Sequence, residues 1–521
     1  MGQKLLSLLE GAHAELDLEL PKKAKNLQNA NSSAGPEENS LDGLSSTDIS
    51  DFMNFANRQG KRILATFKDV LIVNHFDCDG IASGAICALA LKDQGISFRT
   101  LTVKKMDEKV ISNVLADPAN YVIFIDIGAG FLNQINEIAK SGKSILQIDH
   151  HTPEKIQNKS DAFEIVNCHN FGIDGSFYLC SSSCAYFVFA QNCSVTAAKR
   201  IAQIGIVGAI GDMQDAKGML GLNKIMLQEA KSLKVVEVRK DLRLFGRVSR
   251  SLISFLTYCS EPFLPTLSGN SKNCALFLKK SGIPLFEEKD GRKVWLRYYD
   301  LTKEQRISLI GSLLNFCFEK KISEDSIKQM IGDVYLFPDE NHSLELYDGH
   351  EFSSILNACG RNARPDVGIS LCMGDPSAYE SAHSLLLKNR MEISKGISFA
   401  RKFCEDYGSF YFLDARGEIS DSIIGTVAGS YYNSGAFSRD KPIIAISIDE
   451  NNNIKASSRA WMGLSEKGLD LGSVMNKACI AAGGFGGGHS VAAGASFKNT
   501  QEALSKFLLA CKKEIKLQIG I

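Results

Sequence analysis

Short apolar runs alternate with segments of helical length between residues 70 and 210, and this alternation constrains the fold more than any other feature. The predicted strands cover 70–73, 98–103, 121–125, 144–148 and 163–166, of which 70–73, 121–125 and 144–148 are the most apolar, and helical patterns lie at 81–91, 131–139 and 196–210. Strands that alternate with helices build a parallel sheet with helices on both faces. The sequence therefore predicts an α/β fold with a parallel, doubly wound sheet for this part of the chain.

The chain has 521 residues, which is too long for a single hydrophobic core. Residues 28–48 are rich in Asn, Ser, Gly and Glu, which predicts a flexible linker, and the helix before it would dock on the body of the protein or on a partner. We expect a helix and linker at 1–50, the doubly wound domain at 51–255, an inserted, mostly helical module at 256–345, a remaining segment with a connecting helix at 346–404, and a smaller α/β domain at 405–521.

The composition argues against several classes of protein. The chain has no run of about 18 apolar residues, so we expect no membrane span, and its N-terminus does not resemble a signal sequence. A formal net charge of zero argues against a protein that coats nucleic acid, but leaves room for a local basic groove. The 14 cysteines form no CxxC pair, which argues against a zinc site and is typical of the reducing cytosol. We therefore expect a cytoplasmic protein.

One stretch of this neutral chain is strongly basic. Residues 231–250 carry seven Lys and Arg against two acidic residues. Such a stretch is either a helix face in contact with solvent or a strip that binds a nucleic-acid backbone. The sequence leaves both interpretations open.

Acidic residues and histidines follow four of the predicted elements. These segments are His75-Phe-Asp77-Cys-Asp79-Gly80, Asp126-Ile-Gly128, Asp149-His150-His151 and Gly211-Asp212. In an open α/β sheet, ligands bind beyond the carboxyl ends of the strands. We therefore expect all four segments to converge on one crevice.

The residue types in these segments suit a metal centre. Carboxylates and imidazoles bind Mn²⁺, and two such ions about 3.5–4 Å apart need a bridging carboxylate. Taken singly, each segment has a plainer interpretation, since an Asp after a strand is commonly a helix cap or turn residue and HxDxDG also fits a fragment of a calcium loop. Four such segments in order favour a two-metal phosphoesterase. The six candidate ligands are His75, Asp77, Asp79, Asp126, His150 and Asp212, with Asp126 as the bridge.

These four segments resemble the motifs of the DHH phosphoesterase superfamily. Gly487-Gly488-His489-x-x-Ala492-Ala493-Gly494 is similar to the signature of the DHHA1 domain, and the pairing of both domains is the layout of RecJ-like single-strand nucleases. The resemblance covers about residues 60–250 and 350–515. Segments 170–176, 242–247 and 351–361 resemble the archaeal RecJ-like branch, some of whose members associate with the GINS complex.

The resemblance implies a role for each residue of the centre. His75, Asp77 and Asp126 would hold one metal ion, and Asp79, Asp126, His150 and Asp212 the other. Asp149 would orient the site as a partner of its metal-bound imidazoles, and His151 would contact the scissile phosphate. The expected cofactor is Mn²⁺ in two copies, with Mg²⁺ as a possible substitute.

The glycine cluster near the C-terminus points to substrate binding. Glycines let the backbone approach a phosphate closely, so Gly487 and Gly488 are candidate contacts, with His489, Arg459 and Arg361 as charged partners. Without the family resemblance, a glycine-rich turn with a structural histidine would be the preferred interpretation.

Together these features predict a Mn²⁺-dependent exonuclease that hydrolyses single-stranded DNA or RNA, with a role in DNA replication or repair. The strand would lie between the DHH and DHHA1 domains and be gripped through its backbone. Two alternatives remain at this point. One is a phosphodiesterase of short oligonucleotides or small nucleotides, and the other is a replication scaffold that partners GINS, which would be expected to show eroded ligands.

Overall fold

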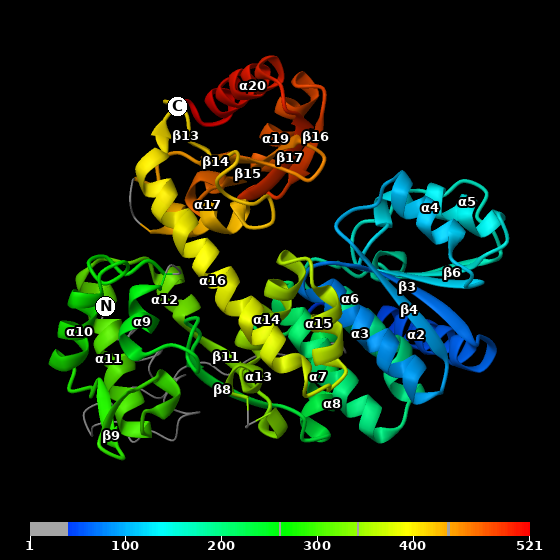
Figure 1. The fold of residues 1–521 in the computed structure, drawn as a ribbon, viewed down its shortest axis with the longest axis horizontal. Coiled ribbons are helices and arrows are strands. Elements are labelled where there is room, and N and C mark those ends of the chain that lie inside the picture. The colour runs from blue at the N-terminus through cyan, green and yellow to red at the C-terminus, as the bar shows by residue number, and fades with distance from the viewer. Residues whose placement is uncertain (1–39, 260–261, 341–342, 435–437) are drawn as a thin grey trace, which may run out of the picture. The chain divides into compact units, whose positions relative to one another are not determined.

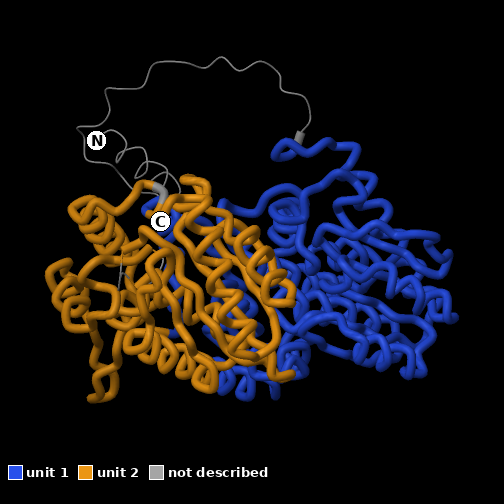
Figure 2. Tube along the Cα trace, turned by 90° about the horizontal axis from the view of Figure 1, so that it is seen from above, with its two compact units in different colours: residues 1–249, 327–386 blue, residues 250–326, 387–521 orange. Residues whose placement is uncertain are grey.

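The computed structural model describes residues 40–259, 262–340, 343–434 and 438–521 (Figure 1). The described chain forms two compact units, coloured separately in Figure 2. The first comprises residues up to 249 together with 327–386, and the second comprises 250–326 and 387–521. The helix predicted within residues 1–27, and the linker up to residue 39, lie outside the described residues.

A five-stranded sheet organises the first unit and confirms the predicted doubly wound fold. All of its strands run parallel, in the order β4-β3-β5-β6-β7. The order reverses between β3 and β5, which makes this point the topological switch of the sheet. The strands are β3 (Asp69–His75), β4 (Ser97–Val103), β5 (Tyr121–Ile125), β6 (Ser144–Asp149) and β7 (Phe163–Asn167).

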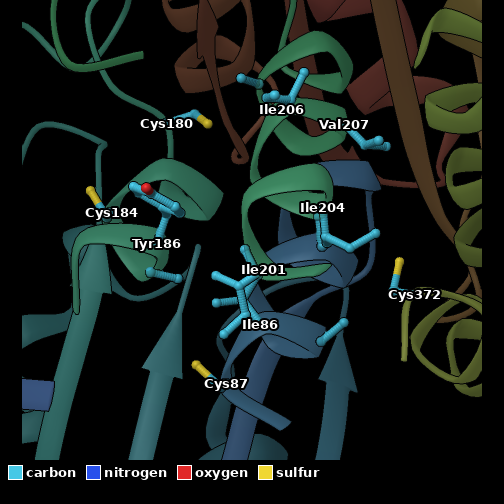
Figure 3. Close-up of a cluster of buried hydrophobic side chains, with 14 of the residues drawn as sticks. Ile86, Cys87, Cys180, Cys184, Tyr186, Ile201, Ile204, Ile206, Val207 and Cys372 are labelled. Carbon is cyan, nitrogen blue, oxygen red and sulfur yellow. The ribbon is translucent and has the colours of Figure 1, made fainter. Parts of the chain in front are cut away.

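Alternate residues of the strands feed two separate cores, one on each face of the sheet. Leu71 and Val73 pack with α4 (Glu108–Ala116) and α5 (Leu132–Lys140) on one face. Val70 and Ile72 face the larger core on the other side. Figure 3 shows part of that core, where apolar side chains and buried cysteines gather between three helices. These helices are α3 (Cys78–Asp93), α6 (Ser181–Phe189) and α7 (Val195–Gly211).

The first unit begins earlier in the chain than the composition suggests. Residues 40–41 and 44–45 pair as β1 and β2, and α2 (Ser46–Thr66) follows directly, although the linker was expected to run to residue 48. The Ser45 hydroxyl accepts from the Thr47 N–H and caps the helix. Helical spacing then buries Ile49, Phe52, Ala56 and Ile63 in the larger core.

The basic stretch 231–250 contains a strand rather than a long helix. β8 (Glu237–Leu242) pairs antiparallel with β11 (Ile331–Leu336). Arg243 and Arg247, which follow β8, are largely buried and form ion pairs, with Asp215 at 2.6 Å and with Asp241 at 3.1 Å. These two arginines therefore belong to the interior. They lie neither on a solvent-exposed helix face nor on a strip that could bind a nucleic-acid backbone.

The module that leaves the first unit runs from residue 250 to 326. It was expected at 256–345, but β11 returns to pair with β8, so residues 327–345 lie with the first unit. Its helices are joined by a hairpin with an Asp290-Gly291 turn, which the sequence reading did not identify. Its elements are α9 (Leu252–Thr257), α10 (Ser271–Lys280), β9 (Phe286–Lys289), β10 (Arg292–Trp295), α11 (Lys303–Glu319) and α12 (Glu324–Met330).

Four α-helices follow β11 in the first unit, and the longest continues into the second. They are α13 (Leu344–Tyr347), α14 (Gly349–Arg361), α15 (Pro365–Cys372) and α16 (Ala378–Phe403), and α16 lies within the segment 346–404, where the sequence predicts a connecting helix. Neither α16 nor any other helix of the described residues combines the length and apolarity required to cross a membrane.

A mixed six-stranded sheet forms the C-terminal part of the second unit. The strand order is β12-β13-β14-β15-β17-β16, and only β13 and β14 run parallel. One core packs against α17 (Ile424–Asn433), and the other packs against α19 (Leu471–Ala481) and α20 (Gln501–Ile519). The strands are β12 (Glu405–Asp406), β13 (Tyr411–Asp414), β14 (Ile443–Ile448), β15 (Asn453–Arg459), β16 (Phe485–Gly488) and β17 (Ala492–Lys498).

Candidate metal centre

The four acidic segments meet at the carboxyl edge of the parallel sheet, around the switch point between β3 and β5. Three groups of side chains each bring their potential ligand atoms within 4.8 Å of one another. The first group is His75, Asp77 and Asp126, and the second is Asp79, His150 and Asp212. The third group joins Asp126 and His150 to Asp149 and His151. All six residues that the sequence singles out as ligands are therefore brought together.

The loop between β3 and α3 presents three of these side chains. Asp77 is the N-cap of α3, and its carboxylate accepts from the Gly80 N–H at 3.0 Å. Its other oxygen lies 3.0 Å from His75 Nδ1. A Cβ at position 80 would lie 2.4 Å from the His75 carbonyl oxygen, so the tight turn requires the glycine. The HxDxDG pattern thus serves two purposes: Asp77 caps helix α3, and His75, Asp77 and Asp79 are candidate metal ligands.

Asp126 links the first group to the second. One of its carboxylate oxygens lies 3.5 Å from His75 Nδ1, and the other lies 3.7 Å from His150 Nε2. The residue is buried and adopts a left-handed backbone with φ of 59°. Its N–H donates to the Ile148 carbonyl, and its carboxylate accepts from the Ser181 hydroxyl at 2.9 Å. An aspartate held in this uncommon conformation, with one oxygen toward each group, has the geometry of a bridging ligand.

Asp79 faces the start of α6. Its carboxylate accepts from the backbone N–H groups of Ser181 and Ser182, at 2.8 and 3.0 Å. The N-terminus of a helix favours negative charge, so α6 stabilises this buried carboxylate. Sequence reasoning identified neither the contact of Asp79 with this helix nor the contact of Ser181 with Asp126. Both contacts join segments that lie about 55 to 100 residues apart in the chain.

In the Asp149-His150-His151 triplet, Asp149 contacts the imidazole ring of His151 and not that of the candidate ligand His150. Asp149 is fully buried, and one of its oxygens lies 2.7 Å from His151 Nδ1. It accepts from the N–H groups of both histidines as well. The ring of His150, which faces the ligand groups, is oriented by the Gly175 carbonyl, 2.8 Å from its Nδ1. Asp149 therefore positions the candidate phosphate contact, and a backbone carbonyl positions the candidate ligand.

Gln214 fixes the last candidate ligand. Its side-chain amide donates to Asp212 Oδ2 and to the Gly175 carbonyl, both at 2.8 Å. Asn223 in turn donates to the Gln214 side-chain oxygen at 2.6 Å. The same amide thus orients both the Asp212 carboxylate and the Gly175 carbonyl that contacts the His150 ring. The positions of these two candidate ligands are therefore coupled. A Gln two residues after Gly211-Asp212 gave no signal of this role in the sequence.

The centre concentrates negative charge in a buried place. Burial raises the pKa of Asp126 well above its usual range, and the charges of Asp77 and Asp79 raise it further. Burial and the same two carboxylates raise the pKa of Asp212 to about 7, against the opposing effect of His150. Burial would lower the pKa of His75, but Asp77 and Asp126 raise it well above its usual value. A divalent cation would relieve this repulsion, so the donor set fits a metal.

Arg361, the first candidate substrate contact, lies at the end of α14 in the same unit as the centre. Burial lowers the pKa of its guanidinium, while the charge of Asp77 opposes that shift. Helix α14 reaches the ligand loop directly, since the Asn357 side chain accepts from the Cys78 N–H at 3.3 Å. Arg361 therefore ends a helix that packs against the loop of the first ligand group.

The other four candidate contacts lie together in the second unit, at one end of the mixed sheet. Gly487 and Gly488 end the edge strand β16, and His489 forms the turn to β17 through two backbone hydrogen bonds with Ala492. Arg459 ends β15 and pairs in register with Ala492. Its side chain lies against α17, where Gly425 and Gly429 leave room for the guanidinium. His489 is exposed.

Comparison with known families agrees with this architecture. The model of the DHH family N-terminal domain matches residues 69–209, which contain the sheet and the first three acidic segments. The DHH-CID domain model matches 244–331, and the DHHA1 domain model matches 410–517. The chain belongs to the DHH superfamily. Its DHH, DHH-CID and DHHA1 domains follow one another along the chain as in a RecJ-like protein.

One relative spans nearly the whole protein. An uncharacterised protein of Methanocaldococcus jannaschii is 29% identical over 452 residues, which cover 86% of this chain and 94% of the relative.

Solved structures share the fold at low sequence identity. RecJ in complex with Mn²⁺ from Thermus thermophilus is 12% identical with a TM-score of 0.54, over 89% of this chain and 55% of RecJ, so this chain spans about half of that protein's length. CDC45 from Entamoeba histolytica is 13% identical with a TM-score of 0.57, over 90% of this chain and 99% of CDC45. An exonuclease RecJ bound to manganese is 12% identical with a TM-score of 0.51, over 89% of this chain and 94% of that chain.

Proposed function

We propose that this protein is a two-metal phosphodiesterase that removes nucleotides from the end of single-stranded DNA or RNA, with Mn²⁺ as its metal. The observation that carries the proposal is the shared aspartate, because Asp126 presents one oxygen to each of two ligand groups. The fold alone does not choose between a nuclease and a scaffold, since RecJ and CDC45 both resemble it. The complete set of six ligands favours the enzyme.

In this proposal His75, Asp77 and Asp126 hold one ion, and Asp79, Asp126, His150 and Asp212 hold the other. The bound ions would supply an activated water and polarise the phosphate oxygens. The chain's own contribution is to hold these side chains in place before the substrate arrives. Gly175, Ser181 and Gln214 do this by fixing His150, Asp126 and Asp212, respectively.

His151 is suited to donate a hydrogen bond to the phosphate. The Asp149 carboxylate can only accept, so it holds the proton on His151 Nδ1 and orients the ring. The hydrogen bond and charge of Asp149 raise the pKa of His151, against the effect of burial. With 59% of its side chain exposed, His151 can present a second N–H to a phosphate oxygen as negative charge develops there.

Backbone contacts would hold the rest of the strand. Arg361 at the end of α14, and Arg459, His489, Gly487 and Gly488 in the DHHA1 domain, supply cations and N–H groups that recognise phosphates rather than base edges. Binding of this kind is tolerant of sequence and weakens as salt increases. We therefore propose a role in DNA replication or repair, where single strands of any sequence must be processed.

The activity test uses 5′- and 3′-labelled single strands of DNA and RNA with Mn²⁺ or Mg²⁺. We expect mononucleotides as first products from one end, and Asp126→Asn should abolish them because the bridging oxygen is lost. Asp161→Asn is the matched control, since Asp161 is exposed and lies outside the centre. Hydrolysis that survives Asp126→Asn at the wild-type rate contradicts the proposal.

A length series separates a polymer substrate from a small one. Strands from dinucleotides to a few tens of nucleotides should be hydrolysed with a KM that falls as length increases, because longer strands reach more backbone contacts. Equal rates on dinucleotides and long strands would instead favour a phosphodiesterase of short oligonucleotides or small nucleotides.

The likeness to CDC45 favours a second, compatible role. It extends over 90% of this chain and 99% of CDC45. Together with the similarity of segments 170–176, 242–247 and 351–361 to the archaeal RecJ-like branch, this supports association with a GINS complex. The test is co-elution of the full-length protein with a purified GINS complex of the same organism in gel filtration. Separate elution at micromolar concentrations contradicts this second role.

A further inference from the structure

Two large apolar side chains are exposed beside the candidate phosphate contacts of the DHHA1 domain. Trp461 and Met462 follow β15 after Ala460, and their exposed fractions are 42% and 56%. Trp461 is one of only two tryptophans in the chain. Exposure of a tryptophan ring to water is unfavourable in free energy. Its position near the candidate phosphate contacts therefore suits a ligand with one apolar part and one anionic part.

The register of the sheet places Trp461 next to the glycine-rich loop. Arg459 pairs with Ala492 across β15 and β17, and the Ala460 N–H donates to the Val491 carbonyl at 2.9 Å. Trp461 follows Ala460 in the chain, and Val491, the partner of Ala460, lies two residues from His489. The loop itself is held from its other side, where the Leu471 N–H donates to the Ser490 carbonyl at 3.0 Å. Tryptophan, histidine and arginine thus share one end of the sheet.

The indole ring is supported rather than loose. A Cβ added at Gly463 would lie 2.4 to 2.7 Å from three atoms of the six-membered ring of Trp461, so the ring rests directly on the backbone of that glycine. The backbone N–H of Trp461 also donates to the Tyr432 hydroxyl at 3.3 Å. A ring that is ordered before binding loses little conformational entropy when a ligand covers it.

We infer that Trp461 is a stacking platform for one nucleobase of the strand, next to a phosphate held by His489 and Arg459. The inference rests on the proposed nucleic-acid substrate and adds what the phosphate contacts lack, which is a surface for the base. Every base has a π-face, so stacking on tryptophan raises affinity without reading sequence. The platform therefore serves DNA and RNA alike and requires only that the nucleotide at this position carries a base.

Binding to the full-length protein tests the platform by fluorescence. Trp295→Phe leaves Trp461 as the sole tryptophan, and a chelator prevents turnover. A short oligodeoxyadenylate should quench the emission in a saturable way, whereas a strand of equal length without bases should not. The matched control is Trp461→Phe, which leaves the exposed Trp295 of the DHH-CID domain and should show no such difference. Equal quenching of Trp461 by both strands, or quenching by neither at saturating occupancy, overturns the inference.

Affinity provides the second readout. Trp461→Ala should weaken binding of oligodeoxyadenylate roughly 5- to 150-fold, the range for loss of one stacked base, and should leave binding of the abasic strand unchanged. Trp461→Tyr should restore most of the affinity, and Trp295→Ala should have no effect. An equal loss on both strands, or no loss on either, contradicts the inference. Strands that bind in this pattern but are never hydrolysed with Mn²⁺ refute the proposed nuclease and leave the platform intact.

Discussion

Asp149 and His151 are joined by one short hydrogen bond but should fail in different ways when they are replaced. His151 is more than half exposed and donates to a carboxylate that has other donors, so the fold has little need of it. Asp149 is fully buried and accepts from the N–H groups of Ala129, His150 and His151 and from the Gln147 amide. The first residue is thus expected to serve the reaction and the second to serve both reaction and fold.

His151→Ala should lower kcat by about 10² to 10³-fold, the typical cost of losing one hydrogen bond to developing charge. The midpoint of thermal unfolding should change by no more than a few degrees. The measurement is steady-state hydrolysis beside a thermal melt, with His169→Ala as the control, because His169 lies outside the ligand groups. An unchanged kcat would show that His151 does not touch the phosphate.

Asp149→Ala should destabilise the protein as well as inactivate it. The substitution leaves several buried donors without an acceptor, and each such loss costs about 1–3 kcal/mol. We expect the free energy of unfolding to fall by at least about 2 kcal/mol in urea titrations. Stability equal to wild type would mean that water or another acceptor replaces the carboxylate.

The metal-free centre should bind Mn²⁺ more tightly as pH rises. The pKa of Asp212 is about 7, and those of His75 and Asp126 are raised, so these groups keep their protons near neutrality and compete with the ion. A raised folded-state pKa also means that the metal-free protein loses stability as pH rises between about pH 5 and pH 8. Thermal melts across this range should show that the increase in melting temperature caused by Mn²⁺ becomes larger as pH rises. A stabilisation by Mn²⁺ that is largest at the acidic end contradicts this account.

At the scale of elements, the loop after α7 is clamped from two sides. It carries Asp212 and, three residues later, the buried Asp215. Arg243, just after β8, lies 2.6 Å from the Asp215 carboxylate and donates to the Ala216 carbonyl at 3.0 Å. His350 of α14 lies 2.8 Å from the same carboxylate oxygen. The strand pair β8–β11 and helix α14 thus fix the loop that presents a candidate ligand.

Arg243→Met should loosen this loop. Breaking a largely buried ion pair costs roughly 3–5 kcal/mol in unfolding free energy, and loss of a residue that positions a ligand lowers metal affinity about 10- to 100-fold. Arg239→Met is the matched control on the adjoining strand β8, because Arg239 is exposed and pairs with Glu237 at the surface. Calorimetric Mn²⁺ titrations should separate the two variants. Equal affinities would show that the clamp is structural only.

The elements show where sequence reasoning succeeds. All five strands of the parallel sheet were predicted. The buried central strands β3, β5 and β6 read as mostly apolar runs, whereas the edge strands β4 and β7 are partly exposed and include polar residues. Parallel strands end at one edge, which brings the six ligands together. The acceptor of His150 could not be predicted, because it is a backbone carbonyl that any residue would supply. The ion pair of Arg247 with Asp348 depends on the return of the chain after the inserted module, which no local pattern indicates.

At the scale of the whole molecule, the candidate metal ligands and most of the candidate substrate contacts lie in different units. The six ligands, His151 and Arg361 belong to the first, and Arg459, His489 and Trp461 belong to the second. A phosphodiester bond is therefore expected to need both units for efficient turnover. Variants of the second unit should raise KM far more than they lower kcat, whereas variants of the first should lower kcat.

The division of labour can be measured with His489→Ala and Arg459→Ala. Each removes a hydrogen-bond donor from the proposed phosphate contacts, so KM for a long single strand should rise about 5- to 20-fold while kcat changes less than about threefold. Arg459→Ala also removes a positive charge, so the salt dependence of binding should become shallower for that variant. A fall in kcat with unchanged KM would place these residues in the reaction itself.

The central claim is that the DHH domain holds two metal ions that share Asp126. Electron paramagnetic resonance of the Mn²⁺-loaded protein, with the bound metal counted on the same sample, tests it most directly. We predict two Mn²⁺ ions per chain with an exchange-coupled signal, and we predict that Asp126→Asn loses the coupling and binds less metal. One uncoupled ion per chain in the wild type, or a coupled pair that survives Asp126→Asn, would contradict the account.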